Sequence, residues 1–145
     1  MTDNIKLQVE VSPTDASVPL GVEIWLDSNK FYDTDWVRES AEITHEFPDS
    51  DSEHEIKFVL KNKLPDHTIC DDQGNIVKDA LIEIKNLKLD DIELGELFYS
   101  KSQYTHNFNG NGADTTEPYM GSMGCNGTVS FKFSSPVYLW LLENM

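Results

Sequence analysis

The sequence predicts an all-β protein, an antiparallel β-sandwich of the jelly-roll type that ends in a short helix or turn. Three observations predict it: apolar residues alternate with polar ones in several short runs, turn-forming residues separate the runs, and no long segment has a helical period. With 145 residues the chain has about the length of one domain and can bury its own core. We therefore expect a single β-sandwich domain over residues 1–145.

The first half of the chain carries the clearest strand patterns. Alternation over residues 5–11 predicts a first strand, half-buried and half-solvated. Residues 21–33, with turn formers at 27–29, predict a hairpin that places Trp25 on its polar face. There Trp25 would cover a second layer of structure or stack on a ligand. Residues 41–47 and 54–60 predict two further strands, and residues 64–75 carry turn chemistry.

The stretch from Asp79 to Tyr99 predicts a long bent strand. Ala80, Ile82 and Ile84 share one parity of the strand period, whereas Leu87 and Leu89 share the other. Because side chains alternate between the two faces of a strand, both groups can enter one core only if an extra residue intervenes. Asn86 is the residue at which we expect that bulge or bend.

The last part of the chain predicts one more strand, over residues 129–133, and then the short helix or turn. Ser135 and Pro136 suit a helix cap and a first helical position, with Val137, Trp140 and Leu141 on one face. A strand would instead align Tyr138, Trp140 and Leu142. The runner-up fold is an immunoglobulin-like sandwich, which we disfavour because the two cysteines lack the strand and Trp setting of such domains.

Charge and hydropathy exclude several partners. The chain has 11 Lys and Arg against 26 Asp and Glu, a formal net charge of −15, and nucleic acids and anionic membranes bind basic surfaces. No apolar run is long enough to insert into a membrane, and the amino terminus lacks a signal-peptide core. We expect the protein in the cytoplasm of the producing cell or in a virion, with Cys70 and Cys125 as reduced thiols. The alternative is a disulfide between them, which requires that the protein works outside the cell.

A long segment from Ser100 to Gly127 is the predicted binding surface. It reads as a loop without regular structure, contains five of the eight glycines, and places aromatic rings beside amide groups. Sugars suit such surroundings, because their C–H faces stack on rings and their hydroxyls pair with amides and carboxylates. The alternative is a loop that only covers one sheet. The candidate carbohydrate contacts are Tyr104, His106, Asn109, Asn111, Asp114 and Tyr119.

If a metal ion is bound, the sequence predicts calcium at clustered carboxylates. Asp90, Asp91 and Glu93 are the first candidate site, and Asp33 and Asp35 are the second. A solvated acidic corner is the alternative at the first of these sites. The spacing around Asp33 fails the helix-loop-helix calcium pattern, and the four histidines lack zinc-site spacing.

No motif for catalysis is present. The sequence contains no nucleophile elbow, no phosphate-binding loop and no dinucleotide fingerprint. With 26 carboxylates available, choosing a pair for glycoside hydrolysis would be arbitrary. We therefore do not expect an enzyme.

Two resemblances follow from these elements. From about Ile5 to Phe133 the order of strands, turns and aromatic loop resembles the jelly-roll carbohydrate-binding modules, particularly the calcium-dependent xylan-binding type. The phrases VEIWLDSNKFYDTDWV, HEIKFVLKNK, IEIKNLKLDDIEL and SSPVYLWLLEN are similar to small uncharacterised proteins of tailed phages that infect marine cyanobacteria. These resemblances imply a free-standing binding module or a virion-associated protein.

Two hypotheses therefore stand. In the first the protein is a non-catalytic carbohydrate-binding module. In the second it is a virion structural or interaction protein, in which the long loop and residues 137–142 bind another protein chain. The sequence also allows a homo-oligomer.

Overall fold

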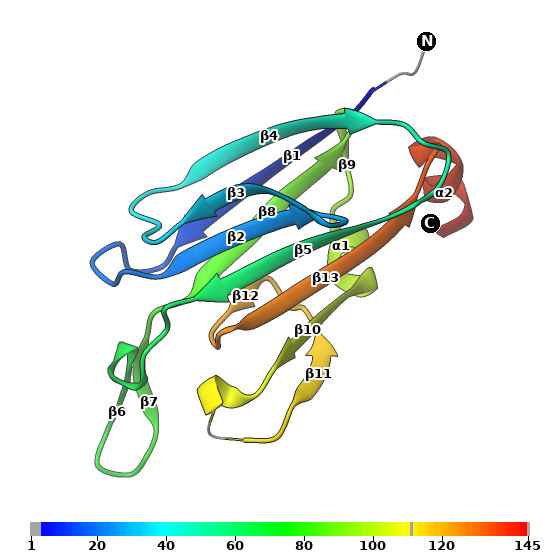
Figure 1. Cartoon of the computed structure of the whole chain (residues 1–145). Coiled ribbons are helices and arrows are strands. Elements are labelled where there is room, and N and C mark those ends of the chain that lie inside the picture. Colours follow the sequence, from blue (N-terminus) through cyan, green and yellow to red (C-terminus); the bar gives the residue numbers. More distant parts are fainter. Residues whose placement is uncertain (1–3, 111, 145) are drawn as a thin grey trace.

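Two antiparallel β-sheets form the body of the protein in a computed structural model that describes residues 4–110 and 112–144 (Figure 1). Sheet A has the strand order β12-β8-β1-β4, with β9 paired to β8, and sheet B has the order β11-β10-β13-β5-β2-β3. The strands of sheet A are β1 (Asn4–Pro13), β4 (Ala41–Pro48), β8 (Ile82–Leu89), β9 (Ile92–Glu93) and β12 (Ser122–Met123). Those of sheet B are β2 (Gly21–Leu26), β3 (Asn29–Thr34), β5 (Glu53–Lys61), β10 (Ser102–His106), β11 (Thr115–Pro118) and β13 (Gly127–Ser134). The predicted antiparallel sandwich is confirmed.

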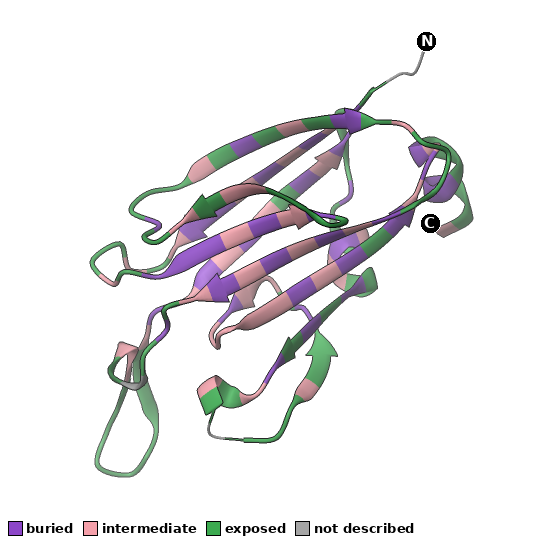
Figure 2. Ribbon diagram, in the orientation of Figure 1, coloured by how far each residue is buried: buried purple, intermediate pink, exposed green. Residues whose placement is uncertain are grey.

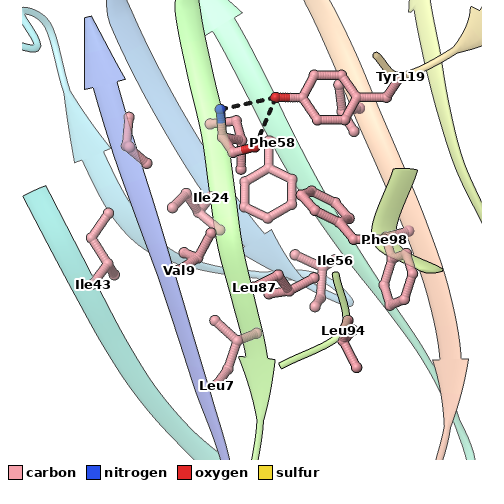
Figure 3. Packing of buried hydrophobic residues seen from close by; sticks show 14 of the residues in the cluster. Leu7, Val9, Ile24, Ile43, Ile56, Phe58, Leu87, Leu94, Phe98 and Tyr119 are labelled. Atoms are coloured by element: carbon pink, nitrogen blue, oxygen red, sulfur yellow. Dashed lines mark hydrogen bonds between the residues drawn. The ribbon is translucent and has the colours of Figure 1, made fainter. Parts of the chain in front are cut away.

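The core lies between the sheets because apolar side chains alternate along their strands. In β1 the buried residues are 5, 7, 9 and 11, and in β5 they include 56, 58 and 60. The residues between them are half-buried, and Ser12, which follows Val11, is buried as well. This alternation is visible along the strands in Figure 2. Figure 3 shows side chains of both sheets meeting in one layer, with Phe58 and Phe98 near its centre. Burial of this apolar layer is the main driving force for the fold.

Two short helices accompany the sheets, α1 (Glu96–Lys101) and α2 (Val137–Asn144). Helix α2 confirms the predicted carboxy-terminal helix, with Val137, Trp140 and Leu141 buried on one face. The Ser135 hydroxyl does not cap it, because this hydroxyl exchanges hydrogen bonds with the backbone of Ser52. None of the helices in the described part of the chain has the length and apolar character that a membrane span requires. Single 3₁₀ turns lie at Pro65–His67 and Phe108–Gly110.

Strand β8 contains the predicted bulge at Asn86. Gln8 pairs with Lys88 and Glu10 with Lys85, so two residues of β8 oppose one residue of β1. Asn86 is exposed and has a φ of 57°, a left-handed conformation that Asn adopts more readily than most residues. As a result all five apolar residues of the stretch enter the same core, namely Ala80, Ile82, Ile84, Leu87 and Leu89.

The prediction of one long bent strand from Asp79 to Tyr99 is wrong for the residues after Leu89. β8 ends at Leu89, and Asp90 and Asp91 both have positive φ, which reverses the chain into β9. Helix α1 then follows after Gly95. Six helical residues are too few to show a clear 3.6-residue period, which explains why this helix was not predicted.

The prediction that residues 100–127 form a loop without regular structure is also wrong. This segment contains β10, β11 and β12, and the β10–β11 hairpin forms one edge of sheet B. The inward residues of β10 are Ser102, Tyr104 and His106, so an apolar period could not reveal the strand. Each of these polar side chains has a hydrogen-bond partner, which makes its burial tolerable.

Strands β6 (Thr68–Cys70) and β7 (Ile76–Asp79) form a separate hairpin that projects from the body (Figure 1). We call it the arm. Its base is fixed by the buried Lys63 ammonium, which donates to Asp79 Oδ1 and to the Ala80 carbonyl at 2.5 Å each. Figure 2 shows the rest of the arm largely exposed, including Ile76 and Val77.

Candidate functional site

Two of the predicted carbohydrate contacts, Tyr104 and Tyr119, lie in the core. Tyr119 has 0% and Tyr104 has 5% of its surface exposed, which corrects the expectation of solvated loop rings. The Tyr119 hydroxyl donates to the Ile84 carbonyl at 3.0 Å and accepts from the Ile84 N–H at 2.9 Å (Figure 3). The Tyr104 hydroxyl bonds the backbone of Cys125. In this conformation both rings are out of a ligand's reach.

The remaining predicted contacts divide by exposure. His106 is buried beside Tyr104, with 4.6 Å between the ring centroids, and its Nε2 lies 3.2 Å from Glu117 Oε1. Asn109 is half-buried, and its Oδ1 accepts from the N–H of Asn126. Asp114 is exposed. Asn111 lies outside the described residues, so its predicted role stays a prediction.

The second predicted metal site is occupied by a lysine side chain. Lys61 Nζ lies 2.5 Å from Asp33 Oδ1, 3.3 Å from Asp35 Oδ1 and 3.3 Å from Glu23 Oε2. The Lys61 hydrogen bonds lower the pKa of Asp33, as does the bond from Lys30. The ammonium group therefore provides at this position the positive charge that a metal ion would otherwise supply.

The first predicted metal site is the turn between β8 and β9. Asp90 Oδ1 accepts from the backbone N–H of Lys6 at 2.9 Å, and Asp91 pairs with the Lys6 ammonium at 3.0 Å. Glu93 lies on β9, in a shallow depression with Glu10, Glu42 and Lys88. Within residues 4–110 and 112–144, no three His, Cys, Asp or Glu side chains are grouped to hold a metal ion. The described residues do not fit calcium at either predicted cluster.

A cleft of about 550 Å³ lies at the end of the sandwich that carries α2. We call it the α2 cleft. Its lining residues come from α2, the first residues of β5, the last residues of β13 and the β2–β3 turn. Figure 1 shows these elements at the same end of the sandwich. Its lining residues are Asp27, Glu53, His54, Glu55, Lys132, Phe133, Ser134, Trp140, Glu143 and Asn144.

Strand register brings the cleft residues together from distant parts of the chain. Across β5 and β13, Glu53 pairs with Ser134, His54 with Phe133 and Glu55 with Lys132. On the other side of β5, the N–H of Asp27 donates to the Glu55 carbonyl. The paired residues of β5 and β13 are thus 77 to 81 positions apart in the sequence, and a single run of sequence could not have revealed them.

Hydrogen bonds hold several polar groups of the cleft in place. Asp27 Oδ1 accepts from the Glu55 N–H, and Asp27 Oδ2 lies 2.9 Å from His54 Nδ1. Glu55 Oε2 accepts from the Ser130 hydroxyl, and this bond, together with the nearby charges of Lys57 and Lys132, lowers the pKa of Glu55. Both carboxyl groups are therefore positioned before any ligand arrives, which reduces the ordering cost of binding.

The outer face of sheet B continues from the cleft towards Trp25. Trp25 pairs with Lys57, two residues along β5 from Glu55, so the outward side chains of 55 and 57 lie about 7 Å apart along the strand. The Trp25 Nε1–H donates to Glu23 Oε1 at 3.0 Å, and the Lys30 ammonium lies 5.6 Å from the ring centroid. No described helix or strand lies over this face in Figure 1, so Trp25 does not cover a second layer.

Comparison with known proteins shows the fold. No protein-family model matches the sequence, and no curated protein matches it. Among solved structures, the chain is similar to a selenomethionine form of vCBM60, with a TM-score of 0.57 at 12% identity. That structure was described with a circular permutation that links two families of calcium-dependent carbohydrate-binding modules. The alignment covers 88% of this chain and 89% of that one. vCBM60 in complex with galactobiose gives a TM-score of 0.54 at 12% identity, over 87% and 96% of the two chains. This chain thus has the sandwich fold of these modules.

Proposed function

We propose that this protein binds carbohydrate without catalysing a reaction, in the manner of a carbohydrate-binding module. The observation that carries the proposal is the fold shared with vCBM60 over most of both chains, since one of those structures holds galactobiose. The α2 cleft and the uncovered face around Trp25 support it, because the cleft offers carboxylate and amide groups and the face offers the Trp25 ring beside Glu23. We propose no catalytic step.

Calcium is not part of the proposed binding site. The vCBM60 modules belong to a calcium-dependent group, but in this chain the Lys6 ammonium pairs with Asp91 in one predicted cluster, and the Lys61 ammonium lies beside Asp33 and Asp35 in the other. Sugar recognition is therefore assigned to protein side chains alone. Of the sequence-predicted loop contacts in the described residues, Asp114 is the one whose side chain is exposed, and it is a secondary contact in this proposal.

A phage origin and a place in a virion belong to the same proposal. A sugar-binding protein of a virus particle would attach it to a host polysaccharide. The alternative is a virion structural or interaction protein without sugar binding. It is favoured by the outward face of α2, where Tyr138, Leu139 and Leu142 are 61%, 45% and 72% exposed.

A glycan array, probed with the purified chain in calcium and again in EDTA, tests the proposal. We expect binding to a group of related glycans in both conditions. Sedimentation velocity on the same sample measures whether the chain self-associates. The proposal fails if no glycan is bound in either condition, and self-association through α2 would then support the alternative.

A further inference from the structure

We propose, on the basis of the carbohydrate-binding function above, that the α2 cleft and the adjoining Trp25 face bind a neutral glycan and reject acidic ones. The cleft volume of about 550 Å³ lies within the range of about 300–1,000 Å³ typical of small-molecule sites. Phe133 and Trp140 form its floor with 2% and 9% of their surfaces exposed, so polar side chains make up its accessible lining, and the adjoining Trp25 supplies the half-buried ring. Together the cleft and the Trp25 face offer hydrogen-bonding groups for sugar hydroxyls and an aromatic surface for a C–H face.

The charges of the cleft select against anions. The cleft lining contains four carboxylates, from Asp27, Glu53, Glu55 and Glu143, and one ammonium group, from Lys132. The Lys57 ammonium lies 3.4 Å from Glu55 Oε1, and the lining still keeps an excess of negative charge. Sugar hydroxyls can donate hydrogen bonds to carboxylates, whereas a uronate or sulfate group would meet like charge. The formal net charge of −15 acts in the same direction, because it repels acidic polysaccharides before contact.

Several lining groups retain hydrogen-bonding capacity. The Nδ2 of Asn144 donates to the Trp140 carbonyl at 2.7 Å, which orients the amide and leaves its Oδ1 to accept. The side chains of Glu53, Glu143 and Lys132 make no hydrogen bond or ion pair within the described part of the chain. Asn144, Glu53 and Glu143 therefore offer hydrogen-bond acceptors to a ligand, and Lys132 offers a donor.

Trp25 gives the site a second position for a sugar ring. It is half-buried on an uncovered sheet face, and its strand partner Lys57 lies one outward position from Glu55 in the cleft. A glycan that fills the cleft and extends along the outer face of β5 would reach the indole ring. Stacking on that ring adds to binding, so an oligosaccharide should bind more tightly than the corresponding monosaccharide.

The test measures affinities by calorimetry for galactobiose, xylotetraose, cellotetraose and the C6-oxidised form of cellotetraose. Two variants change the proposed site. Trp25→Ala changes the outer face of sheet B, and the double variant Glu53→Gln with Glu143→Gln removes two charges from the α2 cleft while keeping the side-chain size. The matched controls are Trp36→Ala, on the exposed β3–β4 connection, and Glu46→Gln, on the outward face of β4. Melting temperatures verify that all variants are folded.

We expect at least one neutral oligosaccharide to bind. Trp25→Ala should weaken it by about tenfold or more, as truncation of a binding anchor does. The wild type should bind the oxidised ligand at least about tenfold more weakly than cellotetraose. In the double Gln variant the difference between these two affinities should be smaller. Both control variants should bind like the wild type.

Two results would overturn the inference in distinguishable ways. If a neutral oligosaccharide binds the wild type, Trp25→Ala and the double Gln variant equally well, the site lies elsewhere and only the inference fails. If none of the oligosaccharides binds and the glycan array is also negative, the proposed function fails with it. Equal or tighter binding of the oxidised ligand would contradict the predicted charge selection.

Discussion

At the scale of single residues, Tyr119 shows how one hydroxyl group completes a sheet edge. Beyond the short strand β12, the N–H and carbonyl of Ile84 face no strand, and the Tyr119 hydroxyl pairs with both. Burial raises the pKa of Tyr119 well above its ordinary value of 10.0. The group therefore stays protonated and can donate its hydrogen bond throughout the physiological pH range.

Tyr119→Phe should lower stability because it leaves two buried backbone groups of Ile84 unpaired. We expect a loss of about 1–3 kcal/mol in the free energy of unfolding, measured by urea denaturation. Tyr138→Phe is the matched control, since Tyr138 is exposed, and it should leave the urea midpoint unchanged. Equal stability of Tyr119→Phe and the wild type would show that the hydroxyl is not structural.

His45 stacks on Phe31 across the two sheet edges formed by β4 and β3. The ring centroids are 4.1 Å apart and the planes differ by 3°. Burial lowers the pKa of His45 from its ordinary value of 6.5. The unfolded chain therefore takes up this proton at a higher pH than the folded chain does, so protonation disfavours the folded state.

The melting temperature should consequently fall as the pH drops below about 6.5 and His45 becomes protonated. The variant His45→Phe keeps a flat ring for the stack and removes the titrating group. Its melting temperature should change less over the same pH range, from about 7.5 to 5.5, than that of the wild type. Parallel curves for the two proteins would mean that His45 does not contribute to the pH dependence.

At the scale of elements, the bulge of β8 determines which side chains enter the core. Asn86→Gly should be nearly neutral, because Gly also adopts positive φ without strain. Asn86→Val should cost about 1–2 kcal/mol, because a β-branched residue is disfavoured in that conformation. Urea denaturation of both variants measures the difference. If valine were tolerated as well as glycine, the left-handed geometry at residue 86 would be incorrect.

The elements also show what sequence alone could predict. Strands with apolar inward residues, such as β1 and β5, and the bulge at Asn86 could be predicted because burial determines their pattern. Strand β10 could not, because its inward residues are polar and become buried only through long-range partners such as the Cys125 backbone. The α2 cleft escaped prediction for a related reason, since register between distant strands assembles it. The position of Trp25 on the outward face was predicted from the sequence, whereas the sheet order was needed to see that no described strand or helix covers it.

At the scale of the whole molecule, lysine ammonium groups contact both predicted acidic clusters, Lys6 at Asp91 and Lys61 at Asp33 and Asp35. Millimolar calcium should therefore leave the melting temperature unchanged, with EDTA as the reference. A site saturated a hundredfold above its dissociation constant would add about 2.7 kcal/mol of stability, which is readily measured. A clear rise in the melting temperature with calcium would contradict this account and reveal ligands outside the two predicted clusters.

The position of the carbohydrate site can be measured by an NMR titration of the isotope-labelled chain with the neutral oligosaccharide that binds most tightly. Backbone amide and indole signals report which residues a ligand approaches. The account predicts that shifts concentrate at Asp27, Glu53, Glu55, Glu143 and the Trp25 and Trp140 indoles, and that they persist in EDTA. Shifts confined to residues 106–117, or abolished by EDTA, would contradict it and return the site to the segment around Asp114.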